Sequence, residues 1–314
     1  MLTDANRRRP DTQLEVLLVT ARHRAFSQPT GPPKPEPWPP AVPDSFADVT
    51  GLPELPASEL TPTLLASGLR HHGAVLVRGL IPAAVARDID EEVERAFAAA
   101  GSVAGSASPS AVPPWFVPFE PSEGYSFGWI ERHFSREIGA VLAVEAPRAL
   151  FRITEALYDA GLGDLIADYL GEWPALSAKK TSLRCARPDS PTEWHQDGAF
   201  LGVDIRTVNV WTALTPCGSD APSIDVFARR FDQIVATGTD DALFSWSVSP
   251  EQAERLDTSD VVRPIFEPGD GLFFDQMTLH RTGISPEMTR TRRALECWFF
   301  APSTYPHEQV PIAF

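Results

Sequence analysis

The sequence predicts an α+β fold in which helices back one sheet of a jelly roll or β-sandwich. The first half of the chain carries long segments with helical periodicity, whereas short β-type segments separated by turns begin near residue 177. Strands at that spacing are typical of sandwiches and jelly rolls. With 314 residues, 43% of them hydrophobic, the chain can bury the core of one large domain.

Residues 1–45 are expected to form an N-terminal arm, and residues 46–314 a single domain. Within the arm, residues 14–26 are predicted to form a short helix, and the proline-dense stretch 28–43 should be extended. We interpret the arm as a tail on the surface of the domain rather than as a docking motif.

Helical segments of the domain are expected at residues 60–71, 82–100 and 142–170, with a strand at 73–80 between the first two. Pro82 stands at a first-turn position, and apolar residues follow it at helical spacing. The last segment should break into two helices near Gly161.

The stretch 104–121 is small, polar and rich in proline, which predicts a loop. It carries Trp115, Phe116 and Phe119. Two interpretations stay open: a lid over a pocket, or a loop anchored by its own apolar residues.

Further strands are expected at residues 181–186, 207–214, 223–226, 261–266, 271–274 and 294–300. They are short and rich in β-branched and aromatic residues, and turn-forming residues separate them. This pattern predicts that a sheet-rich region follows the helices in the chain.

The composition excludes several classes of protein. A formal net charge of −15 argues against a nucleic-acid binder and against binding to anionic membranes. No apolar run approaches the roughly 20 residues that span a bilayer, and no secretory signal is recognisable. Cys185, Cys217 and Cys297 are few and odd in number, as in a reduced, cytoplasmic protein.

The most informative pattern for function is a pair of possible metal ligands, His195 and Asp197, with a possible third ligand, His280, farther along the chain. On a strand, residues two apart point to the same face, so one segment can aim an imidazole and a carboxylate at one point. Two histidines and one carboxylate form the facial triad of non-haem Fe(II) oxygenases, which leaves about three positions open. Taken alone, the pair is more often a surface turn with a solvated aspartate.

A third element is an arginine for a co-substrate. An oxygenase that uses 2-oxoglutarate must neutralise the far carboxylate of that acid in a dry pocket, and arginine matches a carboxylate best. Arg290, Arg292 and Arg293 are candidates. Because Arg292 shares a strand face with Ala294 and Glu296, which suits a cavity better than the apolar opposite face, Arg292 is preferred.

Five motifs together resemble the phytanoyl-CoA dioxygenase family. They are residues 193–197 (EWHQD), 211–214 (WTAL), 268–270 (PGD), 279–283 (LHRTG) and 292–295 (RRAL). The resemblance covers roughly residues 70–302, with the motifs in family order. It implies a double-stranded β-helix, a cupin-like jelly-roll barrel, that uses Fe(II), 2-oxoglutarate as co-substrate, and O2.

The resemblance also assigns roles to individual residues. It implies that iron is bound by three of them: His195, Asp197 and His280. It implies that the co-substrate pocket is formed by five: Arg292 at the distal carboxylate, Thr282 beside it, and Trp211, Leu183 and Arg187 along its walls. Arg184 competes with Arg187 for its place.

Asp197 is intact, whereas halogenating relatives replace this ligand by a small residue. The resemblance therefore favours hydroxylation, or a related oxidation of a C–H bond, in a small organic substrate. The Ala-, Arg- and Pro-rich composition suggests a high-GC bacterium and natural-product biosynthesis. Aromatic residues that are candidates for the substrate wall are Trp115, Phe116, Tyr125, Phe127, Trp129, Phe200 and Trp298.

Three alternatives stay open. The chain could be an acyl-CoA hydroxylase, with Arg148, Arg152 and Arg184 as a local basic patch. It could be a non-catalytic jelly-roll binding module, or, less in keeping with Arg292, a zinc hydrolase. The substrate and the oligomeric state are not readable from the sequence.

Overall fold

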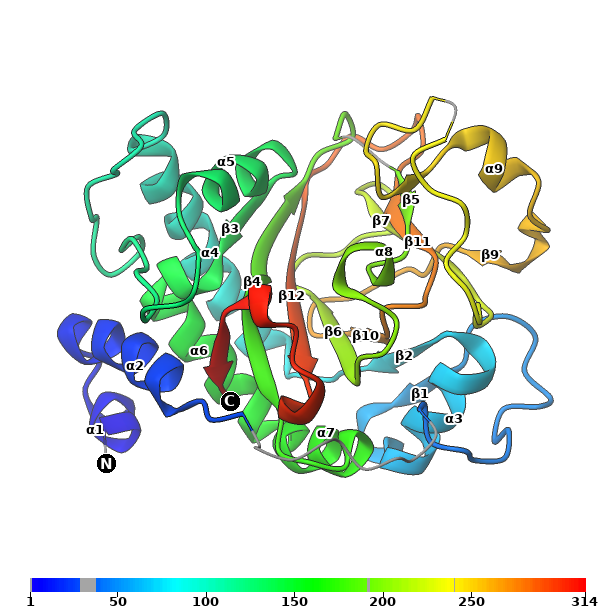
Figure 1. The fold of residues 1–314 in the computed structure, drawn as a ribbon, viewed down its shortest axis with the longest axis horizontal. Coiled ribbons are helices and arrows are strands. Elements are labelled where there is room, and N and C mark those ends of the chain that lie inside the picture. The colour runs from blue at the N-terminus through cyan, green and yellow to red at the C-terminus, as the bar shows by residue number, and fades with distance from the viewer. Residues whose placement is uncertain (1, 29–37, 191–192, 240) are drawn as a thin grey trace.

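The computed structural model describes residues 2–28, 38–190, 193–239 and 241–314 (Figure 1). Its helices are α1 Leu2–Arg8, α2 Thr12–Ala25, α3 Pro62–His72, α4 Ala83–Ser102, α5 Trp129–Glu137, α6 Pro147–Asp159, α7 Leu162–Leu170, α8 Gly198–Leu201 and α9 Pro250–Glu254. Its strands are β1 Glu54–Pro56, β2 Ala74–Arg78, β3 Ala140–Leu142, β4 Ala175–Ala186, β5 Trp194–His195, β6 Thr207–Ala213, β7 Ser223–Phe227, β8 Ser247–Val248, β9 Val261–Val262, β10 Gly271–Phe274, β11 His280–Gly283, β12 Arg292–Phe300 and β13 Pro311–Ala313.

The strands form two sheets. The larger has the order β1-β2-β10-β6-β12-β4-β13, with β3 beside β4, and the smaller has the order β8-β5-β11-β7-β9. Within them β1 and β2 pair in parallel, and the other paired strands run antiparallel. The predicted double-stranded β-helix with helices on one sheet is confirmed.

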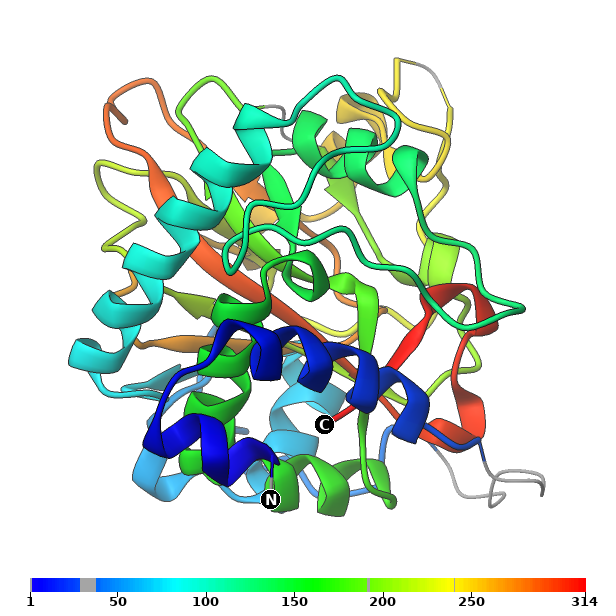
Figure 2. The ribbon, with the colours of Figure 1, turned by 90° about the vertical axis from the view of Figure 1, so that its left-hand side faces the viewer.

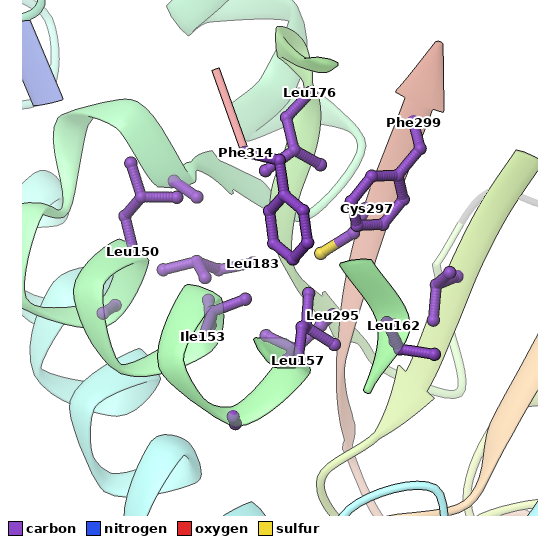
Figure 3. Close-up of a cluster of buried hydrophobic side chains, with 14 of the residues drawn as sticks. Leu150, Ile153, Leu157, Leu162, Leu176, Leu183, Leu295, Cys297, Phe299 and Phe314 are labelled. Atoms are coloured by element: carbon purple, nitrogen blue, oxygen red, sulfur yellow. The ribbon is translucent and has the colours of Figure 1, made fainter. Parts of the chain in front are cut away.

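Helices cover the face of the larger sheet that lies away from the smaller one (Figures 1 and 2). Strand β12 shows how the sequence produces this arrangement. Leu295, Cys297 and Phe299 are buried in the core against α6 and α7 (Figure 3), whereas Glu296 and Trp298 face the other way, as the alternation predicts.

The predicted helices 60–71, 82–100 and 142–170 are confirmed as α3, α4 and the pair α6 and α7, with two differences. Residues 142–145 belong to β3 and a 3-10 turn, so α6 begins only at Pro147. Gly161, with φ of 74°, separates α6 from α7, a backbone angle that favours glycine at this break.

The predicted strands are confirmed in position, although their lengths differ. Strand β4 begins six residues earlier than expected, whereas the segment 261–266 pairs only at Val261–Val262. The shortest strands, such as β5, β8 and β13, were not predicted, because two or three residues carry too little periodicity to be recognised.

Helix α2 of the predicted arm packs against α6 and β13. Val19 belongs to the core, and buried Glu15 accepts hydrogen bonds from Arg148 at 2.9 and 3.0 Å. Most of the proline-dense stretch 28–43, which was expected to be extended, lies outside the described residues. None of the described helices combines the length and the apolar character needed to cross a membrane.

The loop 104–121 is anchored by its own apolar residues, the second of the two interpretations. Phe116 and Phe119 are buried in the core, and the indole of Trp115 donates a hydrogen bond to Glu92 at 2.8 Å. All three side chains contact the helix side of the larger sheet, and none lines the large cavity described below, so a lid role is not supported.

Candidate metal centre

His195 and His280 lie directly opposite each other on the antiparallel strands β5 and β11. Opposed residues in such a pair point to the same side of the sheet, and the two ring centroids are 4.3 Å apart. Pairing of two short strands therefore brings together histidines that are far apart in the sequence.

Asp197 reaches the same point by a route that the sequence did not predict. It caps the short helix α8 with φ of −61° and ψ of −23°, so it does not continue strand β5. The next residue must be small, because a Cβ on Gly198 would lie 2.9 Å from Ile234 and 3.0 Å from the backbone oxygen of Gln276. The tight start of α8 thus turns the carboxylate toward the histidines.

One ligand atom from each of the three side chains lies within 4.8 Å of the other two. The Nδ1 of His195 lies 2.9 Å from the backbone oxygen of Glu193, and that of His280 lies 3.0 Å from the backbone oxygen of Thr278. Because a carbonyl only accepts, each Nδ1 carries the proton and each Nε2 presents a lone pair, as in metal-binding histidines.

The charges also suit a cation. Burial and the neighbouring His280 lower the pKa of His195 to about 4, so this imidazole is neutral near pH 7. Burial opposes ionisation of Asp197, but Lys180 and the two histidines outweigh it and hold the pKa of Asp197 below its usual value. Neutral imidazoles and an ionised carboxylate are the protonation states that bind metal.

The carboxylate of Asp197 has one oxygen engaged and one without a partner. Lys180 donates to Oδ1 at 2.6 Å, whereas Oδ2 is buried, has no hydrogen-bond partner among the described residues and lies 3.5 Å from Nε2 of His280. A buried carboxylate oxygen without a donor is costly. A divalent cation bound between Oδ2 and the two Nε2 atoms would satisfy it, so the residues fit a metal ion.

Lys180 and Glu296 were not among the residues chosen from the sequence. Lys180 also pairs with Glu296 at 3.2 Å, and Glu296 accepts a hydrogen bond from the indole of Trp298 at 3.0 Å. Burial opposes ionisation of Glu296, but the charges of Lys180 and Arg184 lower its pKa to about 2. The alternation of β12 already placed Glu296 on the cavity face, which was the available signal.

A cavity of about 260 Å³ opens between the two sheets beside the three ligands. Both histidines line it, together with three residues that were predicted for the co-substrate pocket: Arg292, Thr282 and Trp211. Cavities of this kind, apolar with a few convergent polar groups, are where small molecules bind.

Arg292 is a buried cation without an anionic partner among the described residues. Only 2% of the residue is exposed; one guanidinium nitrogen donates to the backbone oxygen of Ser223 at 3.3 Å, and Nε has no partner. The guanidinium lies 5.1 Å from the ring centroid of Trp211. Burial lowers the pKa of Arg292 to about 10, so the site favours an incoming carboxylate.

The other two candidate arginines face elsewhere. Arg293 points to the opposite side of β12 and binds Asp90 of α4 at 2.6 Å, and Arg290 is exposed beside Asp220. Of the three arginines, strand alternation thus selected Arg292, which is the one that lines the cavity.

Two residues assigned to the co-substrate pocket by resemblance lie outside it. Leu183 is on the face of β4 that packs against the helices, in the core with Leu295 (Figure 3). Arg187 is exposed and pairs with Asp189 at 3.0 Å. Its competitor Arg184 lines the cavity, because it lies one residue from Leu183 and so on the opposite face.

The basic patch considered for an acyl-CoA does not form. Arg148 and Arg152 bind Glu15 and Asp88, acidic residues of helices on the far side of the larger sheet, whereas Arg184 faces the cavity. The three arginines therefore do not present one surface.

Of the aromatic residues considered for the substrate wall, Phe200 lines the cavity. Trp115, Phe116, Tyr125 and Phe127 pack in or against the core on the helix side. Trp129 stacks on His133 at the surface, and Trp298 packs beneath the cavity on Phe274 and Phe300. The aromatic residues that line the cavity without having been predicted are Phe134, Phe244, Trp246 and Phe274.

Comparison with solved structures identifies relatives in fold. EctD from S. alaskensis with bound Fe has a TM-score of 0.53 at 15% identity, covering 79% of this chain and 82% of that chain. The same protein with 2-oxoglutarate and 5-hydroxyectoine has a TM-score of 0.52 at 15% identity, covering 84% and 87%. EvdO2 from Micromonospora carbonacea var. aurantiaca has a TM-score of 0.50 at 13% identity, covering 79% and 91%.

No curated protein matches the chain in sequence. The family model for phytanoyl-CoA dioxygenase (PhyH), however, matches residues 69–291, which is more than half of the chain and includes the three ligand residues. The match begins in α3 and ends one residue before Arg292. The chain therefore belongs to the phytanoyl-CoA dioxygenase family.

Proposed function

We propose that the chain is a non-haem Fe(II)- and 2-oxoglutarate-dependent dioxygenase that hydroxylates, or otherwise oxidises a C–H bond of, a small organic substrate. His195, Asp197 and His280 would hold the iron, and Arg292 would bind the distal carboxylate of 2-oxoglutarate. The bound iron supplies the activation of O2, coupled to conversion of 2-oxoglutarate into succinate and CO2.

The observation that carries this proposal is the guanidinium of Arg292, which has no anionic partner among the described residues and lines the same cavity as His195 and His280. A purely structural arginine would be expected to have its charge paired, because an unpaired buried charge is costly. A dicarboxylate that reaches from the metal to Arg292 would pair it. A zinc hydrolase or a binding module would leave this arginine without a role.

The remaining side chains of the pocket orient and enclose the co-substrate. The ring of Trp211 lies beside the guanidinium of Arg292, and Thr282 lines the same cavity. At the metal end, Lys180 holds one oxygen of Asp197 and so leaves the other oxygen to the ion. We further propose bacterial secondary metabolism as the setting, which the composition supports.

The test is release of succinate from 2-oxoglutarate in the presence of Fe(II), O2 and a reductant. The wild-type protein should show slow turnover without substrate, and His195→Ala, Asp197→Ala and His280→Ala should abolish it. His133→Ala is the matched control, because this histidine is half-exposed on α5, where it stacks on Trp129 and lies 3.3 Å from Glu137, and it does not line the cavity. Full activity in all three ligand variants would contradict the proposal.

A further inference from the structure

The cavity beside the metal centre is lined by a glutamate whose carboxylate has one buried oxygen without a partner among the described residues. This residue is Glu193, and the oxygen is its Oε2. Glu193 lies two residues before His195, directly ahead of strand β5, and both residues line the cavity. Its backbone oxygen already binds His195, which fixes its place beside the metal centre.

The cations of the cavity do not satisfy Glu193. Lys180 is held by Asp197 and Glu296, and Arg184 lies 3.8 Å from Glu296. Arg281 lies 3.1 Å from Asp225. The fourth cation, Arg292, is the one that the proposed co-substrate takes. No ion pair to Glu193 is found among the described residues, so a ligand in the cavity can supply the donor that Oε2 lacks.

Aromatic rings surround the same part of the cavity. Trp246 lies 5.3 Å from the ring of His195 and 5.5 Å from that of Phe200, and it stacks on Phe244 at 4.7 Å with an interplanar angle of 5°. Phe134 of α5 touches Phe244 from across the opening, at 6.2 Å between ring centroids. We call Phe134, Phe200, Phe244 and Trp246 the aromatic cage; all four line the cavity.

Aromatic faces combined with one unpaired carboxylate form a recognisable chemical environment. The faces attract a cation and its apolar substituents, and the carboxylate accepts a hydrogen bond from an N–H group that carries charge. An anionic ligand would meet the carboxylate with repulsion. A neutral alcohol would satisfy the hydrogen bond but would gain no cation–π attraction from the ring faces.

We infer that Glu193 and the aromatic cage bind a protonated primary or secondary amine, so that the substrate is an amine with an apolar body. The inference rests on the proposed function for the chemistry that follows, but binding of the amine requires only the residues named here.

The probes are three compounds of similar shape, each with a polar group on a phenylethyl body: 2-phenylethylammonium, 2-phenylethanol and 3-phenylpropionate. Binding of each is measured by isothermal titration calorimetry to the protein saturated anaerobically with Fe(II) and 2-oxoglutarate, and to the untreated protein. The amine should bind more tightly than both analogues. Glu193→Gln should weaken the amine about tenfold or more, as expected for loss of one charge-assisted hydrogen bond, and leave the alcohol unchanged.

Two further variants sharpen the result. Phe244→Leu removes one ring of the cage without touching the metal ligands and should weaken the amine several-fold. Glu254→Gln, an exposed position on α9, is the control and should change nothing. If Glu193→Gln does not fold, the ranking of the three probes and Phe244→Leu still decide.

In the protein saturated with Fe(II) and 2-oxoglutarate, where the co-substrate occupies Arg292, tighter or equal binding of the alcohol or the propionate would overturn the inference. An unchanged affinity of the amine in Glu193→Gln, or no binding of the amine, would also overturn it. The preceding titration with Fe(II) and 2-oxoglutarate keeps the two proposals apart. If that titration fails while the untreated protein binds the amine through Glu193, the proposed function fails and the amine site stands.

Discussion

Replacing Arg292 by methionine should stabilise the protein without ligands and remove its affinity for 2-oxoglutarate. Methionine is unbranched and uncharged and replaces the aliphatic part of arginine as far as Nε, and the site around Arg292 is fully buried. The guanidinium is present for a ligand rather than for the fold, because it lacks an anionic partner among the described residues.

The structure gives the size of the effect. Lowering the pKa of Arg292 from 12.5 to about 10 means that burial costs the charged form on the order of 3 kcal/mol. The contact with Trp211 and the hydrogen bond to Ser223 each return about 1 kcal/mol. The free energy of unfolding of Arg292→Met should therefore exceed that of the wild type by about 1 kcal/mol.

Binding should change in the opposite direction. Two charge-assisted hydrogen bonds to a carboxylate contribute about 3 kcal/mol or more, so the dissociation constant of 2-oxoglutarate should rise at least about 100-fold. Urea unfolding with and without 2-oxoglutarate measures both quantities on one sample. Arg293→Met is the matched control: it breaks the pair with Asp90 and should lose stability while keeping its affinity for 2-oxoglutarate.

An Arg292→Met protein that is less stable than the wild type and binds 2-oxoglutarate with unchanged affinity would refute the reasoning. It would mean that the guanidinium serves the fold and that the co-substrate lies elsewhere.

Three further predictions concern acid stability, a turn and the core. The folded-state pKa of Glu296 is lowered from 4.5 to about 2, so its contribution to stability is present above pH 4.5 and is lost as the pH falls toward 2. The free energy of unfolding of Glu296→Gln, measured in urea, should lack this part of the pH dependence. A pH profile identical to that of the wild type would contradict the prediction. Gly269 has φ of 96°, and a Cβ there would clash with the backbone oxygen of Ile81, so Gly269→Ala should lower the free energy of unfolding by about 3 kcal/mol. Gly79 has φ of 61° and open space around it, so Gly79→Ala should lower the free energy of unfolding by only about 1 kcal/mol. Equal losses of stability in the two variants would contradict the predicted clash at Gly269. Leu183→Ala should destabilise the protein by about 2–5 kcal/mol but leave binding of 2-oxoglutarate unchanged; a large loss of affinity in the folded variant would restore Leu183 to the pocket.

Much of the fold could be predicted from the sequence because the period of the apolar residues differs between its two parts. The face of β12 that carries Arg292 followed from simple alternation, and the structure places that face in the cavity. The same rule applied to β4 would have excluded Leu183, which lies on the opposite face from Lys180 and Arg184. There the resemblance was followed in place of the alternation.

Other features of the site could not be predicted, because they depend on contacts between distant segments. Asp197 was expected to continue a strand, but a two-residue strand gives no periodic signal, and the chain enters a helix at this residue. The pairing of Lys180 with Asp197 and Glu296 links three separate elements. Phe244 and Trp246 lie in a long connection without regular periodicity, so nothing in the sequence assigned them to the cavity.

An anaerobic titration of the purified protein with Fe(II) and 2-oxoglutarate, followed by visible absorption, would detect the iron centre itself. Chelation of a 2-oxo acid by iron on a facial triad gives a weak charge-transfer band. We predict that the band appears in the wild type, is lost in His280→Ala, and requires far higher 2-oxoglutarate in Arg292→Met. A correctly folded wild-type protein that shows no band, or a band that persists unchanged in His280→Ala, would contradict the account.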